Sequence, residues 1–342
     1  MWRETTKQER NRILFYEELD DFLPEKILDF HVHLFDEGVV PAGEMFSCSG
    51  HPITHYDRKE LERDLEETYP GRETYAVCFG FPEVRYNRKE NNETLAQACD
   101  RRRFFPLRLF DPAMDDPATL LEDLVSHRFF GIKPYPNYVR KANINEVCIH
   151  EMLPAWVMEI INDKHLAVML HIPRKGRLAD PLNQQQIMEL CERYPHARII
   201  LAHIGRAYFL KNVIGNLEVV KCYPNLYVDL AMLNHWEVLE YTFSQVPHEK
   251  ILYGTDIPLA LAPGKSVEIN DQYTYVTPVP WELSISDDHQ KLAFTSFLYE
   301  ELRAVKKAVE RLHLKQVFKQ KLFFENGMWL LEEIRQFNHF DT

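Results

Sequence analysis

Eight short apolar runs, separated by longer amphipathic segments, limit this chain to few folds. Most of the runs are almost continuously apolar, which is typical of parallel strands covered on both faces. Strands that alternate with helices predict an α/β fold in which each helix returns the chain to the next strand. The predicted strands are 26–33, 74–80, 104–109, 129–135, 166–172, 198–203, 225–230 and 250–255. This number of strands predicts a (β/α)₈ TIM barrel.

Helical patterns fall between the strands, at 57–69, 116–127, 151–164, 182–194, 206–222 and 234–246. Further helices are predicted after the last strand, at roughly 289–311, 314–324 and 326–337. A doubly wound open sheet is the alternative, but no glycine-rich phosphate loop follows the first strand. No linker or charge block divides the chain. We therefore expect an N-terminal extension over 1–25 and a single barrel domain over 26–342, with extra helices at its C-terminus.

Two connections are unusually long, 34–56 after the first strand and 257–288 after the eighth. Both leave the carboxyl ends of strands. Long loops in compact domains are usually functional or disordered. Both also carry turn residues and aromatic side chains, Phe46 in the first and Tyr273, Tyr275 and Trp281 in the second, so we expect a packed lid.

The net charge of −12 at pH 7 argues against nucleic acid as the main partner, because phosphate binding needs a basic face. No apolar run approaches the ~18 residues needed to cross a bilayer, and the first residues show no apolar core of a signal peptide. The six cysteines form no C-x-x-C pair, which fits buried free thiols in a reducing compartment. We expect a cytoplasmic protein that binds a small molecule, and neither nucleic acid nor membrane.

Polar side chains stand where several of the apolar runs stop. The first run ends in His31 and His33, one residue apart, so both imidazoles share a face of the strand. Later runs end at or near Lys133, His171, His203 and Asp256. In a barrel, the carboxyl ends of all strands meet at one mouth, where catalysis takes place. Each residue alone could be a cap, a turn residue or a solvated lysine, but together they predict a metal site.

Other polar residues are weaker candidates. His51 and His55 lie in the first long connection, and His235 follows the seventh strand; the default for the remaining histidines is a surface or core role. Asp29 shares the face of His31 but lies one layer deeper. We therefore expect Asp29 to hold an imidazole from behind the metal site.

The ordered set of H-x-H, His, His and Asp on strands one, five, six and eight resembles the amidohydrolase superfamily of metal-dependent hydrolases. The segments DFHVHLF, FFGIKPYP, VMLHIPR, IILAHIGRAY, NLYVDLA, ILYGTDIPLA and LFFENGMWLL are similar to the amidohydrolase-2 branch. That branch holds hydrolases, related hydratases and non-oxidative decarboxylases. The resemblance runs from about residue 26 to 335, and it is specific for the superfamily and the metal rather than for the substrate.

The resemblance implies one divalent metal ion, held by His31, His33, His171 and Asp256. Imidazole and carboxylate ligands suit Zn²⁺, and also Mn²⁺ or Fe²⁺. Many members bridge two metals with a carboxylated lysine on strand four. Lys133 stands on that strand, but within G-I-K-P, where this branch usually keeps the lysine unmodified. We therefore expect one metal ion, with two as the alternative.

The resemblance also implies catalytic roles for Asp256, His203 and Lys133. Asp256 would accept the proton of an activated water, His203 would orient that water or stabilise the oxyanion, and Lys133 would bind an anionic group or support the developing charge.

Basic residues just beyond two strands, Arg174 and Arg206, are the expected substrate clamps, because a guanidinium forks onto a carboxylate. Tyr135 and Arg85 are further substrate-binding candidates. We expect a hydrolase of a small carboxylate-bearing amide, lactone or ester. A non-oxidative decarboxylase with the same mononuclear site and a non-catalytic binding barrel are the alternatives. A homodimer, which such families often form, is left open.

Overall fold

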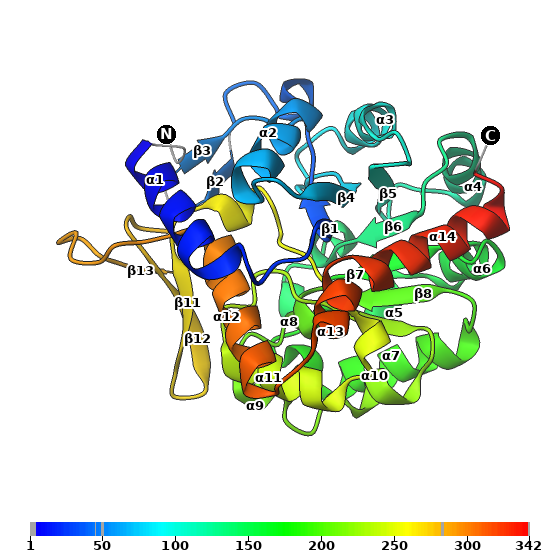
Figure 1. The fold of residues 1–342 in the computed structure, drawn as a ribbon. Coiled ribbons are helices and arrows are strands. Elements are labelled where there is room, and N and C mark those ends of the chain that lie inside the picture. Colours follow the sequence, from blue (N-terminus) through cyan, green and yellow to red (C-terminus); the bar gives the residue numbers. More distant parts are fainter. Residues whose placement is uncertain (1–4, 45, 49–50, 282–283, 341–342) are drawn as a thin grey trace.

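Eight parallel strands form a nearly closed barrel in the computed structural model, which describes residues 5–44, 46–48, 51–281 and 284–340 (Figure 1). They are β1 (Lys26–His33), β4 (Glu73–Phe79), β5 (Phe104–Phe110), β6 (Gly131–Pro134), β7 (Ala167–Leu170), β8 (Arg198–Leu201), β9 (Leu226–Asp229) and β10 (Ile251–Leu252). Neighbours in the sheet follow one another in this order, so every predicted strand and the TIM barrel are confirmed. The first and last strands approach through backbone hydrogen bonds, from Phe30 N–H to Tyr253 O at 2.8 Å and from Asp256 N–H to His31 O at 2.8 Å.

The strands are buried on both faces, as their apolar runs predict. Every residue of β5 and β7 is buried. Neighbouring strands pair in parallel, as with Ala167 opposite Arg198 and Leu170 opposite Leu201. Parallel pairing brings all carboxyl ends to one mouth of the barrel.

Helices alternate with the strands and cover the barrel from outside (Figure 1). The predicted helices correspond to α2 (Arg58–Thr68), α4 (Pro117–Ser126), α5 (Ile149–Met152), α6 (Ala155–Asp163), α7 (Pro181–Arg193) and α11 (Trp236–Gln245). Aspartates fix where several of them begin. Asp57 accepts a hydrogen bond from Glu60 N–H, and Asp116 and Asp180 each accept two backbone N–H groups just before a helical proline. These carboxylates satisfy the free amides of the first turn.

One helix, α3 (Arg88–Ala98), is absent from the sequence prediction. Its buried face combines two asparagines with only two apolar residues, Leu95 and Ala96. Asn91 donates to Leu34 O at 3.0 Å, and Asn92 donates to Leu109 O at 3.1 Å. Both side chains are buried, so the helix packs on strand ends through hydrogen bonds. Hydrophobic periodicity cannot find such a helix.

The predicted helix 206–222 is wrong as a single element. The chain there forms three short helices, α8 (His203–Arg206), α9 (Leu210–Val213) and α10 (Glu218–Cys222). Ile204 and Gly205 have positive φ angles of 51° and 63°, which no continuous helix contains.

The C-terminal helices are present, with shifted bounds. The first, α12 (Phe297–Arg311), begins later than predicted, after a Ser296 cap. It is followed by α13 (Gln316–Gln320), a π-helical turn (Lys321–Glu325) and α14 (Asn326–Asn338).

Both long connections form small sheets. The first contains the hairpin of β2 (Phe46–Cys48) and β3 (His51–Ile53). The second contains a three-stranded sheet of β11 (Lys265–Ile269), β12 (Gln272–Thr277) and β13 (Ser284–Ser286). Figure 1 shows this sheet on one flank of the barrel, beside α12. We call it the inserted sheet.

The segment before β1 also packs against the barrel. It forms α1 (Thr5–Leu14) and a π-helical turn (Phe15–Leu19), and the side chains of Phe15 and Leu19 are fully buried. The stretch predicted as an extension therefore contributes to the core. Within the described ranges, no helix is long and apolar enough to span a bilayer.

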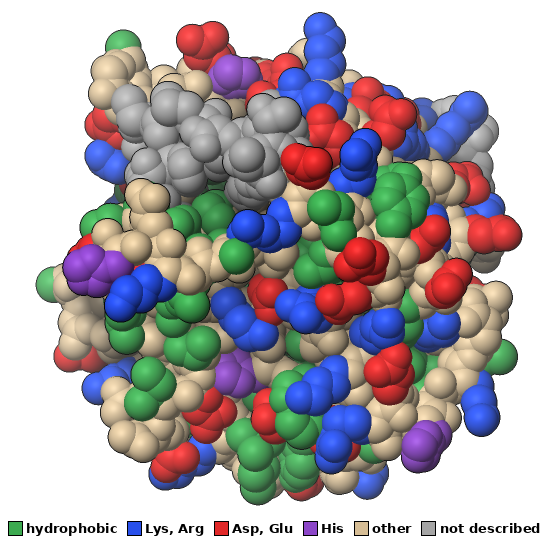
Figure 2. Space-filling view, turned by 60° about the vertical axis from the view of Figure 1, so that its left-hand side comes forward, with side chains coloured by type: hydrophobic (Ala, Val, Ile, Leu, Met, Phe, Trp, Pro, Cys, Tyr) green, Lys and Arg blue, Asp and Glu red, His purple; other side chains and the backbone are tan. Residues whose placement is uncertain are grey.

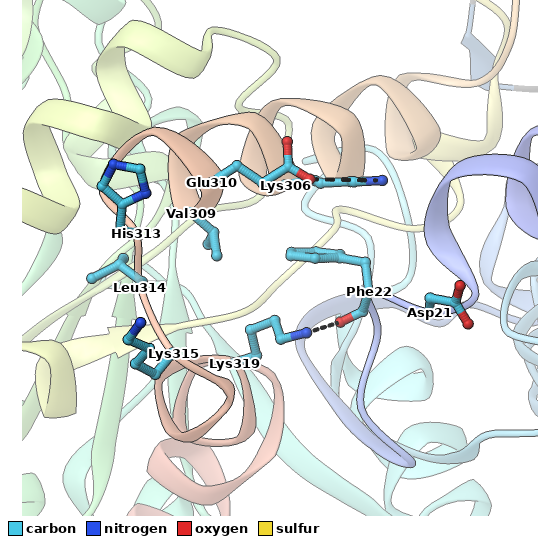
Figure 3. Close-up of a pocket in the computed structure, with 9 residues that line it drawn as sticks. All are labelled: Asp21, Phe22, Lys306, Val309, Glu310, His313, Leu314, Lys315 and Lys319. Atoms are coloured by element: carbon cyan, nitrogen blue, oxygen red, sulfur yellow. Dashed lines mark hydrogen bonds and ion pairs between the residues drawn. The ribbon is translucent and has the colours of Figure 1, made fainter.

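Acidic and basic side chains are interspersed over the face shown in Figure 2. A groove of about 450 Å³ lies near the start of β1, at the end of the barrel opposite the mouth. Its walls come from Phe22 and from the residues joining α12 to α13 (Figure 3). Lys319 Nζ donates to the Phe22 carbonyl at 2.8 Å across it. None of the predicted site residues lines this groove.

Candidate metal centre

His31 and His33 lie side by side at the end of β1, with ring centroids 5.7 Å apart. Both rings are buried, and both use Nδ1 for a protein contact. His31 Nδ1 lies 2.9 Å from Asp229 Oδ2, and His33 Nδ1 lies 3.0 Å from the carbonyl of Gly80. A carbonyl and a carboxylate only accept hydrogen bonds, so Nδ1 carries the proton and Nε2 of each ring presents a lone pair.

Asp256 faces those lone pairs from the chain that follows β10. Its Oδ1 lies 3.1 Å from His33 Nε2 and 3.6 Å from His31 Nε2. A carboxylate oxygen and two imidazole lone pairs repel one another unless a cation stands among them. The arrangement therefore fits a metal ion, whose ligands are neutral imidazole and carboxylate.

His203 adds another nitrogen to this group. Its Nδ1 lies 2.9 Å from the carbonyl of Ala231, which again leaves Nε2 free. His31, His203 and Asp256 each offer one ligand atom, and these atoms lie within 4.8 Å of one another. Among the described residues, this is the one such group of histidine, cysteine and carboxylate side chains.

His171 stands on the other side of the mouth, after β7. Its ring stacks on Tyr135 at 4.5 Å and lies 5.5 Å from the ring of His203. Its Nδ1 is buried and has no hydrogen-bond partner in the described part of the chain. An unpaired buried nitrogen calls for a ligand or a water molecule.

Lys133 is fully buried under the histidines. Its Nζ lies 3.4 Å from His31 Nε2 and 4.5 Å from the centroid of the Phe79 ring. Burial lowers the pKa of Lys133 to about 8, although Asp229 and Asp256 act to raise it. At pH 7 the amine, which lies at the edge of the site, is therefore mostly protonated and positively charged.

Burial keeps three of the imidazoles neutral. It lowers the pKa of His31 and His171 well below the usual value, and the nearby charges of Lys133 and Arg206, respectively, reinforce the shift. Burial also lowers the pKa of His203. Neutral imidazole is the form that binds a metal ion.

The expectation for Asp29 is wrong. Asp29 Oδ1 accepts the backbone N–H groups of His31 and Thr255, both at 3.0 Å, and its other oxygen accepts the hydroxyl of Thr255. It joins β1 to the chain after β10 and touches no imidazole ring. Burial raises its pKa to about 7.

Asp229 has the role that was expected of Asp29, which is to hold an imidazole from behind the metal site. Asp229 is not among the residues predicted from the sequence. It ends β9, is fully buried, and holds the His31 ring through Oδ2. Its Oδ1 accepts the backbone N–H groups of His203 at 2.7 Å and Ala231 at 3.1 Å. The feature of the sequence that could identify Asp229 is its position inside the apolar run NLYVDL. A buried strand rarely carries an acidic residue without a partner.

The predicted substrate-binding residues separate into two groups. Tyr135 stacks on His171, and Arg206 acts electrostatically on the same imidazole while donating to Ile172 O at 3.2 Å. Arg174 Nε is bound to Asp180 at 3.0 Å, beside the start of α7. Arg85 is 63% exposed and pairs with Glu83 and Glu44. The structure thus brings Tyr135 and Arg206 to the metal centre, whereas Arg174 and Arg85 have carboxylate partners elsewhere.

A protein-family model described as amidohydrolase matches residues 29–277, which span all eight barrel strands. The chain belongs to the amidohydrolase family. The predicted resemblance to the amidohydrolase-2 branch is confirmed. Members and structural neighbours of this family are enzymes, and the family generally uses a divalent metal. The search of curated proteins gave no match.

Solved structures show the same fold at low sequence identity. An amidohydrolase from Burkholderia multivorans with bound zinc has a TM-score of 0.58 at 12% identity, over 90% of this chain and 99% of that chain. A probable 2-pyrone-4,6-dicarboxylic acid hydrolase from Acinetobacter baumannii, with citric acid bound, has a TM-score of 0.55 at 12% identity over the same shares. The 5-carboxyvanillate decarboxylase from Sphingomonas paucimobilis has a TM-score of 0.53 at 14% identity, over 90% and 99%.

Proposed function

We propose that this amidohydrolase is a metal-dependent hydrolase of a small, carboxylate-bearing amide, lactone or ester. One observation carries the proposal: the Nε2 lone pairs of His31 and His33 face the Asp256 carboxylate at 3.6 and 3.1 Å. Such a convergence of unprotonated donors has a chemical purpose only around a cation. The family and its enzyme neighbours support the same class of activity.

The proposed metal ligands are His31, His33, His171 and Asp256, with Zn²⁺ as the ion. Three imidazoles and a carboxylate are donors that suit zinc, and a water or substrate oxygen would join them only by expansion of the coordination shell. The unpaired Nδ1 of His171 supports its inclusion, because a buried ring nitrogen without a partner calls for a ligand. The bound zinc of the Burkholderia neighbour supports the choice of ion.

A bound divalent ion supplies Lewis acidity, which makes a neighbouring water acidic near pH 7 and polarises a carbonyl group. The chain supplies the proton transfers. Asp256 would take the proton of the attacking water at its carboxylate and deliver it to the leaving group. His203, whose Nδ1–H is fixed on Ala231 O, would present Nε2 to orient the water or the oxyanion. Lys133 Nζ would neutralise charge that develops beside His31.

Substrate recognition is assigned to Arg206, which acts electrostatically on His171, and to Tyr135, which stacks on the His171 ring. A guanidinium suits a carboxylate, and a phenol can pack on a flat group or donate a hydrogen bond to a polar one. The carboxylate-bearing compounds named for the two enzyme neighbours define a first substrate panel: 2-pyrone-4,6-dicarboxylate and 5-carboxyvanillate.

The experiment is metal analysis followed by turnover of that panel, extended to dicarboxylic lactones and amides. Stoichiometric zinc in the wild-type protein, and loss of both metal and turnover in His31→Ala, would support the proposal. His248→Ala is a matched control, because His248 Nε2 binds a backbone carbonyl away from the centre. Release of carbon dioxide without addition of water would identify the decarboxylase alternative. Metal binding without turnover of any compound would favour a binding barrel.

A further inference from the structure

Two tyrosines from separate parts of the chain both contact the ring of Tyr273 near the candidate metal centre. Tyr208 follows β8, and Tyr275 lies in β12 of the inserted sheet. Each side chain is only 7% exposed. Within the described residues, neither hydroxyl group has a hydrogen-bond partner. Neither oxygen is among the fully buried polar atoms that lack a partner, so both still reach solvent. A hydroxyl that faces solvent beside a site can exchange its water for a polar group of a ligand.

The position of both phenols ties them to the candidate active site. The ring of Tyr208 lies 5.8 Å from the ring of His203. Tyr275 acts electrostatically on Tyr208, and the charge of Asp256 acts on both phenols. Burial raises the pKa of both hydroxyls well above the usual value, so they stay neutral and can donate hydrogen bonds.

Arg177 contacts both the barrel and the aromatic wall, by which we mean Tyr208, Tyr273 and Tyr275. Its guanidinium lies 4.4 Å from the centroid of the Tyr273 ring and 5.3 Å from that of Tyr208. It also donates to the hydroxyl of Tyr273 at 2.9 Å and to the carbonyl of Arg206 at 3.5 Å. The hydroxyl of Tyr273 is therefore occupied, in contrast to those of Tyr208 and Tyr275.

Tyr275 is held from its other sides by aromatic rings alone. Trp281 stacks on it at 5.1 Å, and Phe297 at the start of α12 packs edge-on at 5.4 Å. These contacts fix the ring without using its oxygen. A rigid ring with a free hydroxyl is how a protein presents a preorganised hydrogen-bond donor to a ligand.

We propose that Tyr208 and Tyr275 are specificity-determining residues, whose hydroxyl groups bind a polar group of the substrate. Arg177 is a positioning residue that holds the inserted sheet and its wall at the mouth. This inference rests on the proposed function, and it gives the inserted sheet a role at the mouth of the barrel. A site that expects a polar partner rejects analogues lacking it, because its own groups are then left unpaired.

The test compares Tyr208→Phe and Tyr275→Phe with Tyr69→Phe in the full chain. Tyr69 is the control, since its hydroxyl is bonded to that of Tyr253 at 2.7 Å. Loss of a hydroxyl that has no partner should leave the melting temperature of the ligand-free protein unchanged or higher. Loss of the paired one in Tyr69→Phe should lower it by roughly 1–3 °C. Zinc content should stay equal to wild type in all three variants.

The second readout is kcat/KM for the panel compound that the wild-type enzyme turns over fastest. We expect Tyr208→Phe and Tyr275→Phe to lose about 10- to 100-fold, chiefly through KM, and Tyr69→Phe to keep wild-type values. A melting temperature that falls as in Tyr69→Phe, or unchanged kinetics, would overturn the inference. Absence of turnover by the wild-type protein would count against the proposed function, whereas the comparison of melting temperatures would still decide whether the two hydroxyls are unpartnered.

Discussion

Asp229 Oδ2 lies 2.9 Å from His31 Nδ1, and this contact joins the seventh strand of the barrel to the first. The same carboxylate accepts the backbone N–H of His203. One buried acid therefore sets the tautomer and direction of one imidazole and the position of a second. Such partners behind metal-binding histidines raise ligand basicity and fix ring orientation.

Asp229→Asn is expected to weaken zinc binding about 10- to 100-fold. The amide cannot accept from His31 and from two backbone N–H groups with the strength of a carboxylate, and its NH₂ group must face a donor. Zinc affinity measured by competition with a chelator checks this. Asp271→Asn, an exposed partner of Lys211, is the control and should bind zinc normally. Equal affinities in both variants would remove Asp229 from the site.

His203→Ala tests the division between ligands and catalytic groups. We expect this variant to retain its zinc while kcat falls by roughly 100-fold or more, as for loss of a general acid–base or oxyanion group. His171→Ala should lose zinc. Metal analysis of both proteins, followed by kinetics on the same panel compound, gives the answer. Loss of zinc from His203→Ala would instead make His203 a ligand together with His31 and Asp256, as their mutual distances within 4.8 Å allow.

The barrel could be predicted from sequence because each of its strands is a buried apolar run. The histidines and Asp256 could be predicted for a related reason, since they stand where those runs stop. Asp229 escapes the same reasoning because it is embedded in its run, and only the fold shows that its side chain turns toward His31. Spacing along one strand favours Asp29 for this role, yet Asp29 Oδ1 is occupied by the backbone N–H groups of His31 and Thr255.

The inserted sheet shows another limit of sequence reasoning. Asn270 and Asp271 have positive φ angles of 49° and 59° and join β11 to β12 in a tight turn. Asparagine and aspartate favour that backbone, so a local hairpin signal was present. The sheet packs against Arg177 through Tyr273, and these two residues lie almost a hundred positions apart in the chain. No local sequence pattern relates residues so far apart.

Lys133→Met should make the metal-free protein more stable at pH 7. Burial lowers the Lys133 pKa from 10.5 to about 8, a difference that corresponds to up to about 3 kcal/mol of unfolding free energy. Between pH 8 and 10.5 the unfolded chain binds more protons at this residue than the folded chain does, so wild-type stability gains as pH rises. The advantage of Lys133→Met over wild type should therefore shrink toward zero near pH 10.5.

Urea unfolding of both proteins in chelator at pH 7 and pH 10 measures that advantage. Turnover by Lys133→Met should be lost at both pH values, since a stabilising change at a catalytic position commonly removes function. A constant stability difference across the pH range would mean that Lys133 is charged equally in the folded and unfolded states.

Arg206→Met and Arg174→Met should differ in their effect on substrate binding. Arg206 lies beside His171 and uses one nitrogen on Ile172 O, so the rest of its guanidinium is available to a carboxylate. Arg174 is already paired with Asp180, which also begins α7. We expect Arg206→Met to raise KM about 10- to 100-fold for a carboxylate substrate, and Arg174→Met to change KM less than threefold. Steady-state kinetics on zinc-loaded protein checks both values, and a larger effect at Arg174 would reverse the assignment of the substrate clamp.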